Sequence, residues 1–504
     1  MVQEFVVGFD IGNYSSYVVI GRNNGIESVA DEYSDRNIPT FVGFNDKRRF
    51  VGREAKQQQI TNIPSSIYNF TKLLGKPFND SLVQKDICDL PYKVISIENS
   101  RIGIELNYMN ENKIFTPEQI LAIQLTKLKE VAEMNLSEMV SDVVINVPTF
   151  ATDSERQSIM EASEIANLNC LGLINDTTAS ALAYGIYCET FTGVKTIAFV
   201  DIGYSNFQSN IVKFQNGTMT VVTSSCDQVG GQDFDNVIYR RMKKEIFKSY
   251  KLKVEDKSKA GIRLKQECEK LKKMMSANSM EIPLSIDCFM NDIDVTCKMN
   301  RAEFEELSGD LIVRMKNSLK YLLRKAKMNL KDIDSVEITG GSSRIPFVRQ
   351  TVSEVFKKDI RTSLNADESV ARGCALQCAV KCHNDKVNKY KITDNSNLNG
   401  AHNPYSIKNS KETIVKFKQI EQQMQLQVKL ERERMAMKNS VEEYIYENRD
   451  KIDSLISDDE TKSQILSLFT SIENWLYEEG EDVSKTEYSE KLSTLKSLVE
   501  KFLK

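Results

Sequence analysis

The sequence has few of the residues on which much enzyme chemistry depends. It contains only two histidines, His383 and His402, in 504 residues. Histidine is the usual general base and a frequent metal ligand, so this scarcity argues against catalytic triads and histidine-based metal sites in the first 380 residues. There is no run of eighteen uncharged apolar residues, and the first apolar stretch is interrupted by Asp10 and lacks a basic start. These absences argue against a membrane-spanning helix and a secretory signal.

The net charge is also small. Lys and Arg number 67 against 71 Asp and Glu, which gives a formal charge of −4 with the two signs interspersed. This balance predicts neither nucleic acid nor a membrane surface as a partner. The ten cysteines are scattered along the chain, which is typical of a reduced cytoplasmic protein.

Three cysteines fall at helical spacing near the first histidine. Cys374, Cys378 and Cys382 would share one helix face beside His383, so a zinc site is conceivable. Three thiols on one helix cannot easily surround a tetrahedral ion, and we therefore interpret them as small buried side chains.

A strand–turn–strand pattern occurs twice. "FVVGFDIGNYSSYVVIG" at 5–21 and "AFVDIGYSNFQSNIVKFQNGTMTVV" at 198–222 each place an Asp at the end of a strand and a Gly two residues later. Asp10 and Gly12 correspond to Asp201 and Gly203. Each copy then reaches an Asn-Gly pair, which is a strong hairpin signal. The repeat predicts two equivalent lobes.

Helical periodicity follows the second copy. Residues 260–278 and 301–328 have apolar side chains at helical spacing, and 336–356 reads as a strand, a Gly-Gly turn and a helix.

The composition changes sharply at 383–411, which is polar and aperiodic and predicts a linker. From 412 to 504 the pattern is helical throughout. It predicts one helix of some 40 residues and two shorter helices at about 459–478 and 484–503, together a three-helix bundle.

The two Asp-x-Gly turns suit a phosphate chain bound through magnesium. Such a ligand needs carboxylates for the metal's waters, backbone N–H groups for the oxygens, and glycines that permit close approach. The turns are not Walker loops, because no Gly-Lys-Ser/Thr follows and each strand continues into another strand. Arg344, which follows the Gly340-Gly341-Ser342 turn, could stack on a flat base.

Glu269, Lys272 and Ser276 share one helix face and could hold ribose and base. Each of these elements alone is typical of an ordinary turn or a solvated surface. Their order along the chain nevertheless predicts a bilobed site for ATP and Mg.

Nine ordered stretches resemble the ATPase domain of the heat-shock protein 70 chaperones. They are "FDIGNYSSYVVI", "VINVPTFATDSERQ", "INDTTASALAYGI", "VDIGYSNF", "VGGQDFDN", "CEKLKKMMSAN", "RAEFEEL", "ITGGSSRIP" and "NADESVARGCALQ". The resemblance implies an α/β actin-like bilobed ATPase domain over 1–382, with duplicated ribonuclease-H-like lobes at about 1–193 and 194–382. An all-α helical bundle would follow it.

The matching positions imply a set of ligand-binding residues. Those implied around the phosphates and ribose are Asp10, Gly12, Asn13, Tyr14, Asp201, Gly203, Tyr204, Gly230 and Gly231. Those implied around the adenosine are Glu269, Lys272, Ser276, Gly340, Gly341, Ser342, Arg344 and Asp367. Asp10 and Asp201 would hold Mg through water, and Pro148 and Arg156 match the family's switch between the lobes.

Several departures from the chaperones weaken the case for hydrolysis. Thr71 stands where the family has a catalytic lysine, and we expect the adjacent Lys72 to point elsewhere. Asp176 replaces part of a Glu-Pro pair, and Asn206 replaces a Thr that faces phosphate. Losing one aimed donor costs roughly a hundredfold in rate. We therefore expect ATP binding with hydrolysis weak or absent, and Asp176 and Asp201 are only weak catalytic candidates.

The Asp-Ile-Gly-aromatic-Ser and Asn-Asp-x-Thr patterns resemble the heat-shock protein 110 branch, as does the C-terminal "ENWLYEEG". Members of that branch are nucleotide exchange factors for heat-shock protein 70 partners. In both branches a peptide-binding β-sandwich separates the ATPase domain from the helices, whereas here "NPYSIKNS" at 403–410 leads directly into a helix.

The resemblance thus implies a cytoplasmic co-chaperone of the stress response. It would bind a heat-shock protein 70 through its ATPase domain and its bundle, with no peptide-client site. Two alternatives remain open: a reduced ATPase with slow hydrolysis, and a ribosome-associated adaptor that binds a J-domain protein.

Overall fold

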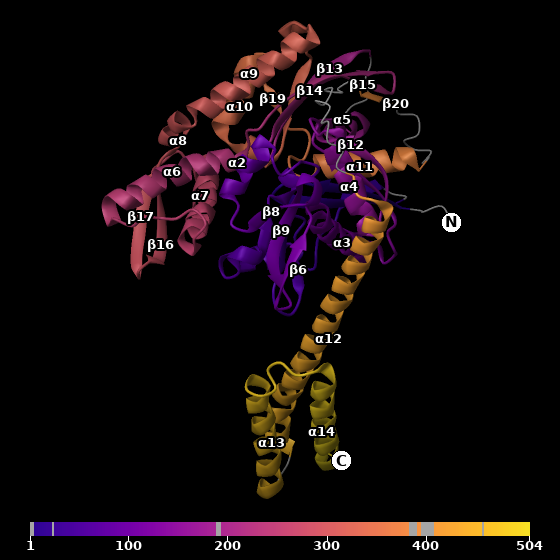
Figure 1. The fold of residues 1–504 in the computed structure, drawn as a ribbon, viewed down its shortest axis with the longest axis vertical. Helices are drawn as coiled ribbons and strands as arrows, with labels where there is room; N and C mark the ends of the chain where they lie inside the picture. Colours follow the sequence, from indigo (N-terminus) through magenta and orange to yellow (C-terminus); the bar gives the residue numbers. More distant parts are fainter. Residues whose placement is uncertain are drawn as a thin grey trace. The chain divides into compact units, whose positions relative to one another are not determined.

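The computed structural model describes residues 5–22, 25–187, 193–382, 391–394, 408–455 and 458–503. The chain divides into two compact units, one of residues 1–45 with 50–421 and one of 46–49 with 422–504. Figure 1 shows the elements of both units. None of the helices in the described segments has the length and apolar composition that crossing a membrane requires.

The first sheet of the larger unit is built on the hairpin that contains Asp10. Strands β1 (Val6–Ile11) and β2 (Ser15–Arg22) pair antiparallel, and β3 (Gly25–Ser28) extends the sheet beyond β2. On the other side of β1, β11 (Asp142–Val147) and β12 (Asn169–Asn175) pair parallel. The strand order is β12-β11-β1-β2-β3. The central β1 is covered on both faces, which explains its nearly continuous apolar sequence.

The second sheet repeats this plan around Asp201. Strands β13 (Lys195–Ile202), β14 (Phe207–Gln215) and β15 (Thr218–Asp227) are antiparallel. Strands β18 (Ser335–Thr339) and β19 (Ile360–Arg361) add in parallel beyond β13. The shared order of hairpin and parallel partners confirms the predicted duplicated α/β lobes.

The predicted Asn-Gly turn joins β14 to β15. Asn216 and Gly217 both have positive φ, 47° and 72°, as the tight hairpin turn requires. Asn24, in the corresponding turn of the first copy, lies outside the described residues.

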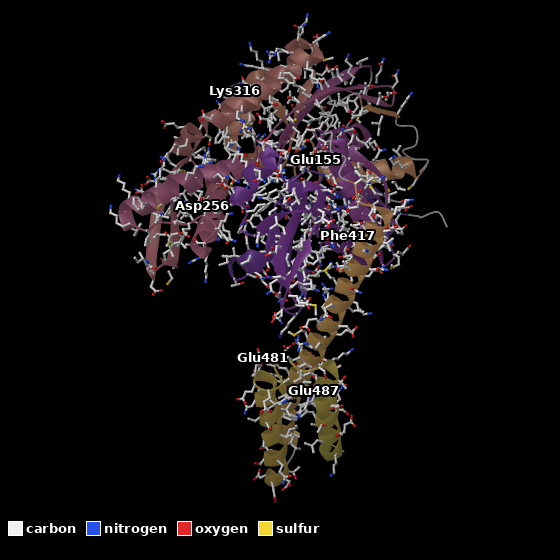
Figure 2. The ribbon with its side chains drawn as sticks, in the orientation of Figure 1. Glu155, Asp256, Lys316, Phe417, Glu481 and Glu487 are labelled. Atoms are coloured by element: carbon white, nitrogen blue, oxygen red, sulfur yellow. The ribbon has the colours of Figure 1, made fainter. Side chains whose placement is uncertain are left out.

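Lobe I carries further strands and helices around the first sheet. Its small strands are β4 (Ile38–Pro39), β5 (Phe41–Phe44), β6 (Arg49–Val51), β7 (Ser66–Tyr68), β8 (Lys93–Ile97), β9 (Arg101–Tyr108) and β10 (Glu111–Phe115). Its helices are α1 (Arg53–Gln57), α2 (Ser81–Asp89), α3 (Pro117–Leu136) and α4 (Asp153–Ile165). Glu155, labelled in Figure 2, completes a capping box with Thr152 at the start of α4.

Two helices join the lobes at their base. Helices α5 (Asp176–Tyr187) and α11 (Ser369–Lys381) pack closely at Gly373. A side chain at this position would overlap the backbone of Ala179. One apolar core contains side chains from α5, α11 and both sheets. The strand ends that bear Asp10 and Asp201 are therefore held on a common base.

Two of the three cysteines lie within α11 as small packing residues, and Cys382 caps the end of this helix. Cys374 and Cys378 are buried and Cys382 is partly exposed. Among the residues that the structure describes, no group of His, Cys, Asp and Glu side chains could hold a metal ion directly. The zinc interpretation thus gains no support, while His383 and His402 lie outside the described residues.

Lobe II has a helical side and a β-hairpin. Its remaining elements are α6 (Gly231–Tyr250), α7 (Lys259–Ala277), β16 (Ile282–Met290), β17 (Ile293–Met299), α8 (Arg301–Leu307), α9 (Gly309–Ala326) and α10 (Pro346–Phe356). The expected helical run at 301–328 is divided at Ser308. Its buried hydroxyl donates to the carbonyl of Phe304 at 2.8 Å, and Gly309 follows. Local bonding by serine and a glycine both disfavour a continuous helix.

The described part of the predicted linker includes a strand. This strand, β20 (Lys391–Asp394), pairs in parallel with β15 at the edge of the second sheet. Most of "NPYSIKNS" lies outside the described residues, but Asn409 is buried and donates its side-chain amide to Glu161, while the carboxylate of Glu421 accepts from Thr126. The first three turns of the long helix therefore belong to the larger unit.

The smaller unit is helical, as predicted for the C-terminal region. It contains the greater part of α12 (Lys411–Leu455) together with α13 (Asp459–Tyr477) and α14 (Lys485–Leu503). Its core includes Val441, Ile465, Phe469 and Leu495. The domain boundaries at 382 and 412 remain a prediction.

Candidate functional site

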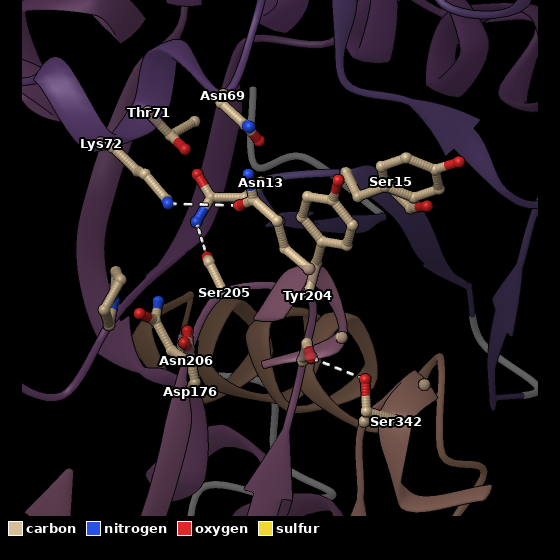
Figure 3. A pocket seen from close by; sticks show the side chains of 18 of the residues that line it. Asn13, Ser15, Asn69, Thr71, Lys72, Asp176, Tyr204, Ser205, Asn206 and Ser342 are labelled. Carbon is tan, nitrogen blue, oxygen red and sulfur yellow. Dashed lines mark hydrogen bonds between the residues drawn. The ribbon is translucent and has the colours of Figure 1, made fainter. Parts of the chain in front are cut away.

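A cleft of about 690 Å³ lies between the two lobes of the larger unit, and its walls come from both copies of the hairpin. Figure 3 shows this cleft from close by. It is lined by most of the residues predicted to hold ATP: Asp10, Gly12, Asn13, Tyr14, Asp201, Gly203, Tyr204, Gly231, Glu269, Lys272, Ser276, Gly340, Gly341, Ser342, Arg344 and Asp367. Residues up to 357 positions apart in sequence thus meet at one site.

Two predicted residues do not line the cleft. Gly230 lies one residue before the lining residue Gly231 and packs against the backbone of Tyr204, which a side chain at this position would overlap. Arg156 of the predicted switch instead binds the Asn175 side chain at 2.6 Å and the carbonyl of Ala151 at 3.2 Å. Its predicted partner Pro148 does line the cleft.

Three carboxylates lie at the floor of the cleft. Burial raises the pKa of Asp10 well above its ordinary value, and the negative charges of Asp176 and Asp201 raise it further. Burial, and then the charge of Asp176, raise the pKa of Asp201 to about 7. Burial also raises the pKa of Asp176. This concentration of negative charge favours a bound cation.

Two amide side chains that the sequence analysis missed hold Asp176 in place. Asn146 donates to one carboxylate oxygen at 2.9 Å and Gln208 donates to the other at 2.7 Å. Asn146 also accepts from the backbone N–H of Ile11 at 2.6 Å, which ties β11 to the end of β1. An Asn and a Gln inside two separate strands give no signal of this kind in the sequence.

The glycine turns allow the loops to approach one another. The N–H of Gly231 and the hydroxyl of Ser342 both donate to the carbonyl of Gly203, at 3.0 and 2.9 Å. Gly340 has a φ of 83° and no room for a side chain against Ile202. A glycine is therefore required at that point of the turn.

The side chains expected around adenosine are already ordered by protein contacts. Lys272 Nζ lies 2.8 Å from Asp235, which the sequence analysis missed, and 3.1 Å from the carbonyl of Gly231. Arg344 binds Asp367 through two parallel bonds of 2.9 and 2.6 Å. Burial raises the pKa of Asp235 to about 6, although the Lys272 ammonium opposes this.

The segment around Thr71 corrects one expectation. Lys72 was expected to point elsewhere, yet both Thr71 and Lys72 line the cleft (Figure 3). They lie on a short 3₁₀ turn, Phe70–Leu73, so the alternation of a regular strand does not apply. Lys72 Nζ lies 3.3 Å from Gln232 on the opposite lobe and 3.4 Å from Asp86.

The residues fit a hydrated magnesium ion and a phosphate chain. No group of side chains in the described segments holds a metal directly, but Mg²⁺ normally retains several waters, and Asp10 and Asp201 could bind those waters. Asn13, Asn69 and Thr71, which line the cleft, each have a buried side-chain oxygen with no hydrogen-bond partner. A buried polar atom without a partner is rare, and a bound ligand would satisfy it.

A comparison with known families identifies the class of protein that this fold and cleft define. The family model described as Hsp70 protein matches residues 6–400. The chain therefore belongs to the heat-shock protein 70 family, whose ATPase domain implies nucleotide binding with magnesium.

Individual relatives define the branch. Heat shock 70 kDa protein 4 of Homo sapiens is 45% identical over 77% of this chain and 47% of its own length. The 97 kDa heat shock protein of Strongylocentrotus purpuratus is also 45% identical, over 77% of this chain and 44% of its own length. Heat shock 70 kDa protein 4L of Homo sapiens is 44% identical over the same shares as the first.

These similarities place the chain in the heat-shock protein 110 branch, as the sequence motifs predicted. The chain spans about half the length of the curated relatives it matches.

Proposed function

We propose that this chain is an ATP-binding co-chaperone that acts as a nucleotide exchange factor for a heat-shock protein 70. The observation that carries the proposal is a cleft that keeps the family's nucleotide-binding positions but has Thr71 at the position of the catalytic lysine. Membership of the heat-shock protein 110 branch supports it. In this reading ATP is a ligand that fixes the shape of the ATPase domain.

Within this proposal each group of cleft residues has a role. Asp10 and Asp201 hold the waters of magnesium, and the backbone N–H groups of Asn13 and Tyr204, which follow Gly12 and Gly203, bind phosphate oxygens. The adenosine lies against Lys272, Ser276 and the Gly340–Arg344 turn, which the contacts to Asp235 and Asp367 keep in place. Magnesium would offset the repulsion among the buried carboxylates.

Hydrolysis would be weak because no cation is aimed at the attacking water from position 71. In phosphoryl transfer, most of the rate acceleration usually comes from stabilising the charge that develops in the transition state. Asn206 lies in the cleft where the chaperones have a hydroxyl donor. Binding does not depend on these two positions, so we expect affinity to persist where turnover is lost.

The exchange step would use both units of the chain. The ATP-bound ATPase domain binds the partner's ATPase domain, and the helical bundle binds the partner's far lobe and holds its cleft open so that ADP leaves. Bound ATP would favour the arrangement of lobes that the partner recognises. This role requires ATP to bind but not to be hydrolysed.

Release of fluorescent ADP from a purified heat-shock protein 70 tests the proposal. We expect this chain with ATP to accelerate release at stoichiometric amounts. Gly203→Asp should abolish both ATP binding and the acceleration, because it brings a carboxylate to the phosphates. Gly309→Asp is the matched control, since it adds the same charge outside the cleft at a position where an added Cβ meets no atom within 4 Å. An unchanged release rate with the natural sequence would contradict the exchange role.

Slow hydrolysis is the second candidate, and the position of Lys72 favours it. Its ammonium lies in the cleft within 3.3 Å of Gln232, so a cation is available beside the position that Thr71 occupies. Single-turnover hydrolysis with Lys72→Ala separates the candidates. If hydrolysis is measurable and falls at least about tenfold in the variant, Lys72 serves turnover. If no hydrolysis is measurable, the exchange role stands alone.

A further inference from the structure

Tyr14 makes its main contacts across the cleft. It follows β1 in lobe I, and its ring stacks on that of Tyr204 in lobe II, with ring centres 4.6 Å apart and planes inclined by 26°. Its hydroxyl donates to the carboxylate of Glu269 on α7, also in lobe II. A third contact is made beside it, where Asn13 donates to the hydroxyl of Ser205.

Lys56 fixes the same ring from within lobe I. Its ammonium lies 4.2 Å from the ring centre of Tyr14 and donates to the tyrosine hydroxyl at 2.7 Å. Phe41 meets the ring edge-on at 6.1 Å. Burial and the charge of Glu269 raise the pKa of Tyr14, so the hydroxyl keeps its proton and remains a donor at neutral pH. The ring is therefore held by both lobes at once.

These contacts do not suit Tyr14 as a residue that holds phosphate. Its hydroxyl is occupied by Glu269 and Lys56, and its ring face by Tyr204. Glu269 is occupied as well, because both Tyr14 and Lys273 bind its carboxylate. Burial acts to raise the pKa of Glu269, but these two bonds keep the pKa below its ordinary value.

We propose that Tyr14 and Tyr204 form an aromatic clamp that joins the lobes directly and thereby sets how long the cleft retains a nucleotide. The retention part rests on the proposed ATP binding, whereas the joining of the lobes does not. A stacked pair and a hydrogen bond to a carboxylate act in addition to any contact that the ligand makes with both lobes. The clamp lengthens nucleotide residence by opposing lobe opening, the step that releases the ligand. Tyr14 is in this sense a positioning residue.

Dissociation of a fluorescent ATP analogue from the full chain tests the clamp. Tyr14→Ala should release the analogue at least about tenfold faster than the natural sequence, and Tyr204→Ala several-fold faster. Tyr14→Phe keeps the stacking but loses the bond to Glu269, so its release rate should lie between those of the natural sequence and Tyr14→Ala. The double variant should release no faster than Tyr14→Ala, because either change opens the same clamp. Accelerations that multiply in the double variant would show two separate ligand contacts and overturn the proposal.

Hydrogen exchange of the nucleotide-free chain tests the clamp independently of ATP binding. Tyr14→Ala should increase exchange of the amides of α7 and of the 203–206 turn, and Tyr204→Phe, which keeps the stacking, should not. Tyr17→Phe is the matched control, because it removes a tyrosine hydroxyl from neighbouring β2. Unchanged exchange in Tyr14→Ala would overturn the clamp, even if the natural chain bound no nucleotide. A natural chain that binds no nucleotide would refute the proposed function alone.

Discussion

The acidic floor of the cleft shows how single residues link ligand binding to stability. Asp10, Asp176 and Asp201 are brought together by the ends of β1, β12 and β13, and the bonds to Asp176 come from the neutral side chains of Asn146 and Gln208. Burying like charges costs free energy unless a counter-charge compensates. The folded chain therefore favours either the protonated form of these carboxyl groups or a cation bound beside the carboxylates.

Asp201→Asn should stabilise the ligand-free protein at pH 8. The pKa of Asp201 rises from 3.8 to about 7 on folding. The preference of the folded chain for the protonated carboxyl group therefore adds fully to the free energy of unfolding below about pH 4, and this contribution is lost as the pH rises through about 7. An amide cannot ionise and still accepts the bond from Thr339. We expect the free energy of unfolding to increase by about 2 to 4 kcal/mol at pH 8 and by little at pH 4, as urea unfolding followed by circular dichroism would measure.

The same variant should lose magnesium-dependent ATP binding by at least about tenfold, which a titration with a fluorescent analogue would measure. Asp359→Asn, at an exposed position, is the control and should change neither quantity. Destabilisation by Asp201→Asn at pH 8 would show that burying the charged carboxylate of Asp201 does not destabilise the folded protein.

At the scale of elements, the features that the sequence revealed are those with a local signal. The Asn216-Gly217 turn, the strand before Asp201 and the helix that became α7 all follow from patterns within about twenty residues. The division at Ser308 depends on a buried hydroxyl bond, which periodicity alone does not show.

Contacts between distant segments left no comparable signal. Asn146 and Gln208 were missed because their common partner Asp176 is far from both in sequence. Strand β20 was missed because four residues in a polar segment become a strand only by pairing with β15. The family resemblance located the cleft residues, but not the contacts that occupy Tyr14 and Lys272.

The turn after α13 provides a test at this scale. Gly480 is buried beneath the ring of Trp475, and an added Cβ would lie 2.5 Å from a ring atom. Gly480→Ala should therefore destabilise the smaller unit by about 1 to 3 kcal/mol. Trp475 is the single tryptophan of the chain, so its fluorescence during urea unfolding reports on this unit directly. Gly309→Ala, where an added Cβ meets no atom within 4 Å, should leave that transition unchanged; an equal effect of both variants would contradict the packing argument.

At the scale of the whole molecule, the cleft is contained in one unit. Every residue that lines it belongs to the larger unit, whereas the apolar core around Phe469 belongs to the smaller one. A ligand that binds only the folded form of one unit stabilises that unit in proportion to its own binding free energy. The two units should therefore respond differently to a nucleotide.

Adding ATP with magnesium should shift the unfolding of the larger unit alone. At a ligand concentration one hundred times the dissociation constant, the expected stabilisation is about 2.7 kcal/mol. Heat unfolding followed by circular dichroism, to which the larger unit contributes most of the signal, should move to higher temperature. The transition followed by Trp475 fluorescence should stay in place. Gly203→Asp removes the phosphate contacts and should abolish the first shift without moving the second transition. Equal shifts of both signals in the natural sequence would show that the two units unfold together, and the bundle's stability would then depend on the nucleotide.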